Sequence, residues 1–145
     1  MNKFCLLSIA LLSAATAGAA EDFNGSRPMD CKPLQGHDCL PTESACKPLK
    51  PEPGGAMEQR GMHIDVNNMT VKTPYRNDTL PIQSFSFNTK SLVLQGTSLE
   101  LVWSATIHRT TGRLTIAIVD REGSYIIFGQ CALSDAKPAT KPQSN

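Results

Sequence analysis

Histidine and acidic side chains are the residues of this sequence that could carry acid–base chemistry. His37, His63 and His108 could each act as a base near neutral pH, but the last two occupy polar positions of alternating segments and are expected to face solvent. Asp120 and Glu122 share a turn, which lacks the burial that gives two catalytic carboxylates different roles. The sequence contains no Gly-x-Ser-x-Gly, His-Glu-x-x-His or glycine-rich phosphate loop. We therefore expect no catalytic residues, with an enzyme that uses His108 as the alternative.

The first 20 residues have the composition of a secretory signal peptide. Lys3 supplies a positive charge, residues 5–12 form an apolar run, and small residues precede the expected cleavage after Ala19 or Ala20. The run is too short to cross a bilayer, and no later segment predicts a membrane span. Cleavage removes Lys3 and changes the formal net charge from +1 to zero. A neutral mature chain argues against nucleic acid as a partner, and we expect a periplasmic or secreted protein without a cofactor.

Four cysteines remain after the leader, which carries Cys5, is removed: Cys31, Cys39, Cys46 and Cys131. An even number in an exported protein predicts two disulfides, with three possible connectivities. We favour Cys31 with Cys131 and Cys39 with Cys46, because a short local loop and one long-range link strain the chain least.

A metal site is the alternative interpretation of the same region, with His37 joining Cys31, Cys39 and Cys46. The spacing C-x5-H-x-C-x6-C lacks the close cysteine pairs of structural zinc sites. Exported cysteines are normally oxidised, so the disulfide interpretation is preferred and no metal ligand is assigned.

The elements that would position these residues are strands, most clearly in residues 99–131. Apolar and polar residues alternate in residues 99–108, where only Val102 interrupts the polar face, and again in 113–118, as in strands with one buried face. Two turns, residues 109–112 and 120–123, each carry glycine at the fourth position, where a type I turn with a bulge needs a positive φ. Residues 125–128 form a continuous apolar run, expected of a strand covered on both sides.

The whole chain divides into four parts. Residues 1–20 form the leader, and residues 21–61 a Cys- and Pro-rich segment expected to be irregular. Residues 62–133 form a small antiparallel all-β meander or barrel of about seven strands. It starts with a hairpin around Asn67-Asn68, and Asn tolerates the left-handed conformation that such a turn demands. Residues 134–145 form a polar tail.

Four aromatic side chains could line a ligand site inside such a barrel: Trp103, Phe85, Phe87 and Phe128. Small barrels are more often filled by their own side chains, so we favour a packed core. The expected function is a non-catalytic periplasmic binding or accessory protein, an inhibitor or subunit-like partner of another protein, with residues 73–79 as a candidate contact loop. The alternative is a lipocalin-like carrier of a small apolar ligand.

Several short segments carry a resemblance to known proteins. FNGSRPMDC and HDC, together with LVLQGT, the run W-S-x-x-I-x-x-x-T-G-R-L-T and the closing FGQC, resemble a set of small exported proteobacterial proteins of unknown function. The resemblance covers residues 23–131 and implies a periplasmic location and a β-fold, without a mechanism. In overall plan the chain is also similar to periplasmic β-barrel lysozyme inhibitors, although it has no inhibitory loop motif to transfer.

Overall fold

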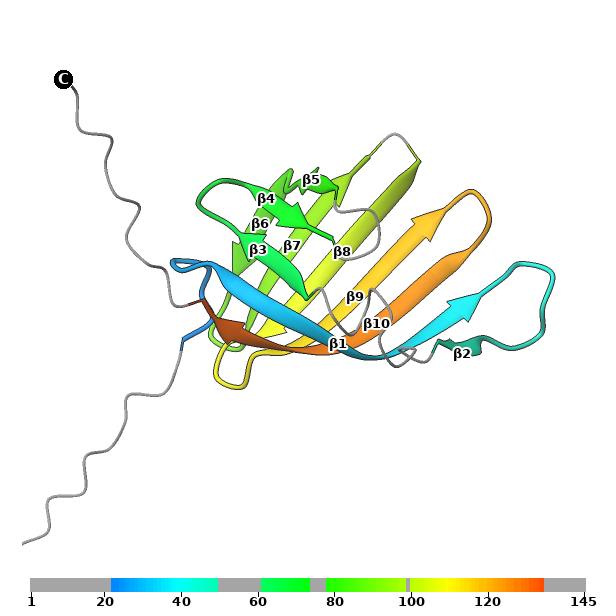
Figure 1. Cartoon of the computed structure of the whole chain (residues 1–145), viewed down its shortest axis with the longest axis horizontal. Helices are drawn as coiled ribbons and strands as arrows, with labels where there is room; N and C mark the ends of the chain where they lie inside the picture. Colours follow the sequence, from blue (N-terminus) through cyan, green and yellow to red (C-terminus); the bar gives the residue numbers. More distant parts are fainter. Residues whose placement is uncertain (1–21, 50–60, 74–77, 99, 135–145) are drawn as a thin grey trace, which may run out of the picture.

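The protein forms one antiparallel β-sheet (Figure 1). The computed structural model describes residues 22–49, 61–73, 78–98 and 100–134 of the 145-residue chain. In these ranges no helix has the length and apolar character needed to cross a membrane. The strands are β1 (Met29–Cys39), β2 (Lys47–Leu49), β3 (Met62–Asp65), β4 (Thr70–Lys72), β5 (Thr79–Pro81), β6 (Ser84–Phe87), β7 (Ser91–Thr97), β8 (Leu101–His108), β9 (Arg113–Asp120) and β10 (Ser124–Leu133).

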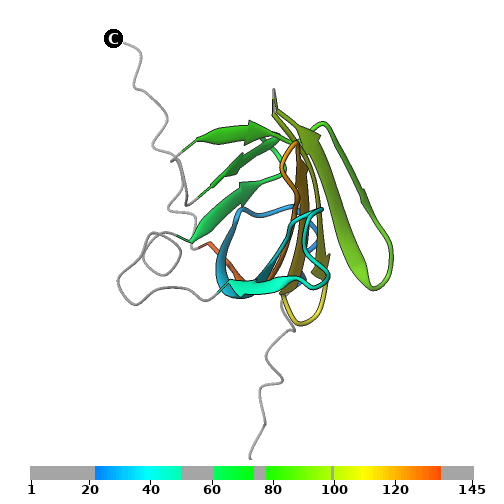
Figure 2. The same cartoon turned by 90° about the vertical axis from the view of Figure 1, so that its right-hand side faces the viewer.

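Nine of the ten strands follow the order β5-β4-β3-β1-β10-β9-β8-β7-β6, and β2 pairs with β1 outside this order. The sheet curls into a half-barrel, with β3–β5 facing β7 and β8 across the interior (Figure 2). The curl brings β5 against β7, where the Pro81 carbonyl oxygen packs against Gly96. The predicted all-β antiparallel class is confirmed, with more strands than expected.

The main difference from the sequence prediction is β1, which lies in the segment expected to be irregular. This strand occupies the middle of the sheet, antiparallel to β10 on one side and to β3 on the other. Met29, Cys31 and Pro33 alternate as buried residues, and a bulge between Pro33 and Gln35 accommodates the proline. The strand is set by long-range pairing with β10, which local composition does not encode.

The core lies on the concave face of the sheet. Strand β8 buries Trp103, Ala105 and Ile107, as its alternation predicted; Leu99 lies outside the described residues. In β10 the prediction of a strand covered on both sides was wrong. Phe128 is 40% exposed while Ile127 is buried, because no second layer of described residues covers the convex face at Phe128.

The turns agree with the sequence prediction in one case and differ in two. Gly112 has φ 67°, the positive φ predicted at the fourth position of its turn, and its amide donates to the His108 carbonyl at 2.8 Å. Gly123 is instead required by close packing, because a β-carbon there would lie 2.6 Å from the Cys39 carbonyl oxygen. Asp120 Oδ1 accepts hydrogen bonds from the Glu122 and Gly123 amides in that turn. In the β3–β4 turn the residue with a left-handed conformation is Met69, with φ 55°. Neither Asn67 nor Asn68 has a positive φ.

Two disulfides fasten β1, with the pairing favoured above. Cys31 and Cys131 are directly opposite each other on β1 and β10. Cys39, at the end of β1, joins Cys46 across a sequence separation of 7 residues. A metal site that joins His37 to the cysteines would need free thiolates, and Cys31, Cys39 and Cys46 are all bonded in these disulfides. The leader, residues 74–77 of the candidate contact loop, and residues 135–145 of the tail lie outside the described residues.

Candidate ligand cavity

A cavity of about 170 Å³ lies inside the half-barrel, partly open to solvent. It is bounded by β3, β4 and β5 on one side and by β8 and β9 on the other. Nine of the ten described residues that line it are apolar, and Thr73 is the polar exception. The lining residues are Met62, Ile64, Val71, Thr73, Leu80, Leu101, Trp103, Ala105, Ile116 and Ile118.

The cavity exists because a small residue stands in the middle of β8. Ala105 pairs with Leu94 on β7 and with Ile116 on β9, and all three side chains point to the interior. The short strands opposite, β4 and β5, carry Val71 and Leu80. These side chains do not fill the space in front of Ala105, whose side chain is a single methyl group. Close packing fills most protein interiors, so this unfilled apolar volume is a distinctive feature of the molecule.

Trp103 forms one wall of the cavity at the seam where the sheet curls closed. Its side chain is 5% exposed, and its ring covers Gly96, where an added β-carbon would lie 2.6 Å from Cζ2. The indole Nε1 is buried and has no hydrogen-bond partner among the described residues. Trp103 is thus a lining residue of the cavity, and no charged side chain is among the described residues that line it.

Of the four aromatic residues predicted to line a ligand site, the structure places Trp103 in the cavity and the other three outside it. Phe85 and Phe87, 47% and 60% exposed, lie on β6, beyond the point where β5 meets β7. Phe128 points to the convex face because it alternates with the buried Ile127 and Gly129. The lining residues that sequence reasoning missed come from β3, β4 and β5, whose approach to β8 depends on the curl of the sheet.

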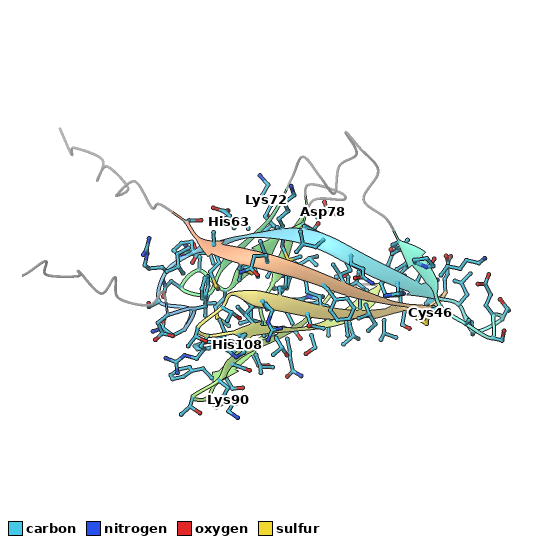
Figure 3. The ribbon with its side chains drawn as sticks, turned by 90° about the horizontal axis from the view of Figure 1, so that it is seen from below. Cys46, His63, Lys72, Asp78, Lys90 and His108 are labelled. Atoms are coloured by element: carbon cyan, nitrogen blue, oxygen red, sulfur yellow. A yellow bond between two sulfur atoms is a disulfide. The ribbon has the colours of Figure 1, made fainter. Side chains whose placement is uncertain are left out.

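His63 and His108 occupy separate surface positions (Figure 3). His108 Nδ1 lies 3.1 Å from Thr110 Oγ1, above a shallow groove on the convex face whose lining residues, which include Thr106 and Arg113, contain no carboxylate. His37 contacts the edge of Phe128, with ring centroids 6.4 Å apart. The described part of the chain contains no cluster of three metal-ligating side chains.

His63 belongs to a surface network that superficially resembles a catalytic triad. Its Nδ1 lies 2.7 Å from Asp30 Oδ1, and Ser134 donates a hydrogen bond to Asp30 Oδ2. Partial burial opposes ionisation of Asp30, but the hydrogen bonds from Ser134 and His63 outweigh it, and the pKa of Asp30 lies below its usual value. A catalytic triad places histidine between serine and aspartate. Here the aspartate is central, so the network ties the end of β10 to β1 and β3.

Comparison with protein-family models, with curated proteins and with solved structures finds no match to this chain.

Proposed function

We propose that this chain is a non-catalytic binding protein that holds a small apolar molecule in the cavity of its half-barrel. The observation that carries the proposal is an apolar cavity of about 170 Å³. An engineered cavity of about 150 Å³ with similar apolar walls stays dry and binds benzene. The cavity is thus large enough for a single ring of about that size.

The chemistry of the walls defines the class of ligand. Aliphatic side chains and Trp103 provide dispersion contacts, and Thr73 is the single polar residue in the described part of the lining. A carboxylate or ammonium group would lose its hydration without gaining a partner of opposite charge. Uncharged hydrocarbons such as toluene are expected to bind, and charged analogues of the same shape, such as benzoate, are not.

The expected site of action is the periplasm or another exported compartment. Two disulfides are typical of proteins that fold in an oxidising environment outside the cytosol. The positive charge of Lys3 and the apolar run of residues 5–12 also predict export. In this setting a carrier would take up a small apolar compound that crosses the cell envelope.

Trp103 provides a direct assay, because it is the single tryptophan of the chain and lines the cavity. Titration of the oxidised protein with toluene, with excitation of the tryptophan, should give a saturable change in emission. Benzoate at the same concentrations should give none. Absence of a saturable response to toluene would contradict the proposal.

Filling the cavity should abolish the response. Ala105→Leu places a larger side chain in the cavity, and Ile118→Phe is a second variant that fills it from β9. Ala117→Leu is the matched control, because Ala117 alternates with the inward-facing Ile116 and Ile118 and lies on the other face of β9. Circular dichroism and urea midpoints establish that each variant is folded. Toluene binding that survives in folded Ala105→Leu and Ile118→Phe proteins would place the ligand elsewhere.

A further inference from the structure

Strand β6 (Ser84–Phe87) is an edge of the sheet with unsatisfied hydrogen-bonding capacity. It pairs with β7 alone among the described strands and lies on the outer side of the β6–β7 hairpin (Figure 2). The Asn88 amide donates to the Ser91 carbonyl at 2.9 Å, which makes these two residues a hydrogen-bonded pair. Because pairs alternate along an antiparallel ladder, the backbone N–H and C=O groups of Phe85 and Phe87 point away from β7.

The other sheet edges carry features that block strand addition. Strand β2 contains Lys47 and Pro48, and β5 ends at Pro81, whose carbonyl packs against Gly96. Proline and lysine are common devices that protect an edge strand. The sequence Ser-Phe-Ser-Phe of β6 contains no proline and no charge, so this edge is open to another strand.

The side chains of β6 also lack cover. Phe85 and Phe87 are opposite Leu94 and Leu92, which are fully buried, yet the two phenyl rings are about half exposed. They form one wall of an open groove of about 500 Å³, and Met69 contributes to the lining of the same groove.

The positive charge of Arg109, which lines this groove, is already balanced by Asp22 of the same chain. The Arg109 guanidinium lies 5.7 Å from the centre of the Phe87 ring and is paired with Asp22 at 2.6 Å. The groove therefore presents apolar rings beside an ion pair, without an unbalanced charge that would attract an acidic or basic partner.

We propose that the occupant of this edge is a second copy of the chain, paired β6 to β6 in antiparallel register about a two-fold axis at Ser86. In this register Phe85 of one copy is opposite Phe87 of the other, and the free backbone groups of both residues form hydrogen bonds across the axis. The four phenyl rings then share one face of a continuous sheet, as expected of an isologous interface.

Charge and sequence both favour a second copy over an unrelated extended peptide. The strand is complementary to itself, since polar Ser86 meets its own copy and Ser84 meets the neutral Asn88. No like charges oppose one another across the proposed axis. The formal net charge of the chain is +1, so two copies repel each other weakly. The interface is small compared with that of a standard stable dimer, so association should depend on protein concentration.

Sedimentation equilibrium of the oxidised protein, from micromolar to millimolar concentration, tests the proposal. We expect a reversible monomer–dimer equilibrium. Phe85→Lys and Phe87→Lys should each weaken it roughly tenfold or more, because each removes apolar area from the interface. Phe128→Lys is the matched control, since Phe128 is an exposed phenylalanine on the convex face, and its dimerisation should equal that of the natural sequence.

Cross-linking tests the register independently of any loss of stability. Across the two-fold axis, Ser86 forms a non-hydrogen-bonded pair with Cα atoms about 4.5 Å apart, a separation that a disulfide spans. Ser86→Cys should therefore give a covalent dimer under mild oxidation. Ser84→Cys, on the same strand but away from the axis, should not. A protein that stays monomeric at millimolar concentration, a dimer unaffected by either lysine variant, or equal cross-linking of both cysteine variants would overturn the proposal.

Discussion

At the scale of single residues, the ion pair between Asp22 and Arg109 fastens the start of the described chain to the β8–β9 turn. Arg109 donates from Nε to Asp22 Oδ1 at 2.8 Å and from Nη2 to Oδ2 at 2.6 Å. Next to it, the Phe23 amide donates to the Arg109 carbonyl at 2.9 Å, and the Phe23 side chain is buried. The pair thus positions an aromatic residue that closes one end of the core.

The hydrogen bond from Arg109 lowers the pKa of Asp22 below its ordinary value of 3.8. A carboxyl group whose pKa is lowered by folding stabilises the protein above the unfolded-state pKa and loses that contribution as the pH falls through the folded-state pKa. The loss is therefore expected below about pH 3.8. NMR titration of side-chain carboxyl carbons should show a lowered pKa for Asp22, which Arg109→Gln should return towards the ordinary value. An Asp22 pKa unchanged by Arg109→Gln would contradict this assignment.

Gly96 should tolerate no side chain. An added β-carbon would lie 2.6 Å from Trp103 Cζ2 and would also clash with the Pro81 carbonyl oxygen. We expect Gly96→Ala to reduce the free energy of unfolding by about 1–3 kcal/mol, the usual cost of overpacking. Urea denaturation measures the change, with the exposed neighbour Gln95→Ala as the control. An equal effect of both substitutions would argue against close packing at the seam between β5 and β7.

At the scale of elements, β1 depends on its covalent links more than on its own composition. It is rich in polar residues and interrupted by Pro33, but Cys31 and Cys131 join it to β10 at directly opposite positions. Only four of its 11 residues are buried, so the long-range disulfide is expected to carry much of its stability.

The two disulfides should therefore differ in their effects. The chain-entropy relation gives about 4.7 kcal/mol for a separation of 100 residues, as between Cys31 and Cys131, and about 2.4 kcal/mol for the 7 residues between Cys39 and Cys46. We expect the double substitution Cys31→Ala/Cys131→Ala to destabilise the protein by more than Cys39→Ala/Cys46→Ala. Urea unfolding of both double variants measures the difference. A larger loss from the local bridge would contradict the account.

At the scale of the whole molecule, the features that could be predicted from the sequence are the strands with a periodic pattern and the disulfide bonds. Alternation in residues 113–118 and in β8 located the core face, and cysteine spacing indicated the disulfide pairs. β1 and the cavity were not predictable in the same way. Both depend on how the sheet curls, which brings Val71 opposite Ala105 and leaves Phe85 outside. No local pattern in the sequence carries that information.

The half-barrel thus combines an internal cavity with one open edge, and the cavity is the basis of the proposed function. Xenon binds dry apolar cavities of this size, so diffraction from crystals held under xenon pressure shows whether the cavity accepts an apolar guest. We expect a xenon atom between Val71 on β4 and Ala105 on β8, and none in crystals of Ala105→Leu. Ordered water in this volume, or no xenon at pressures that fill other apolar cavities, would contradict it.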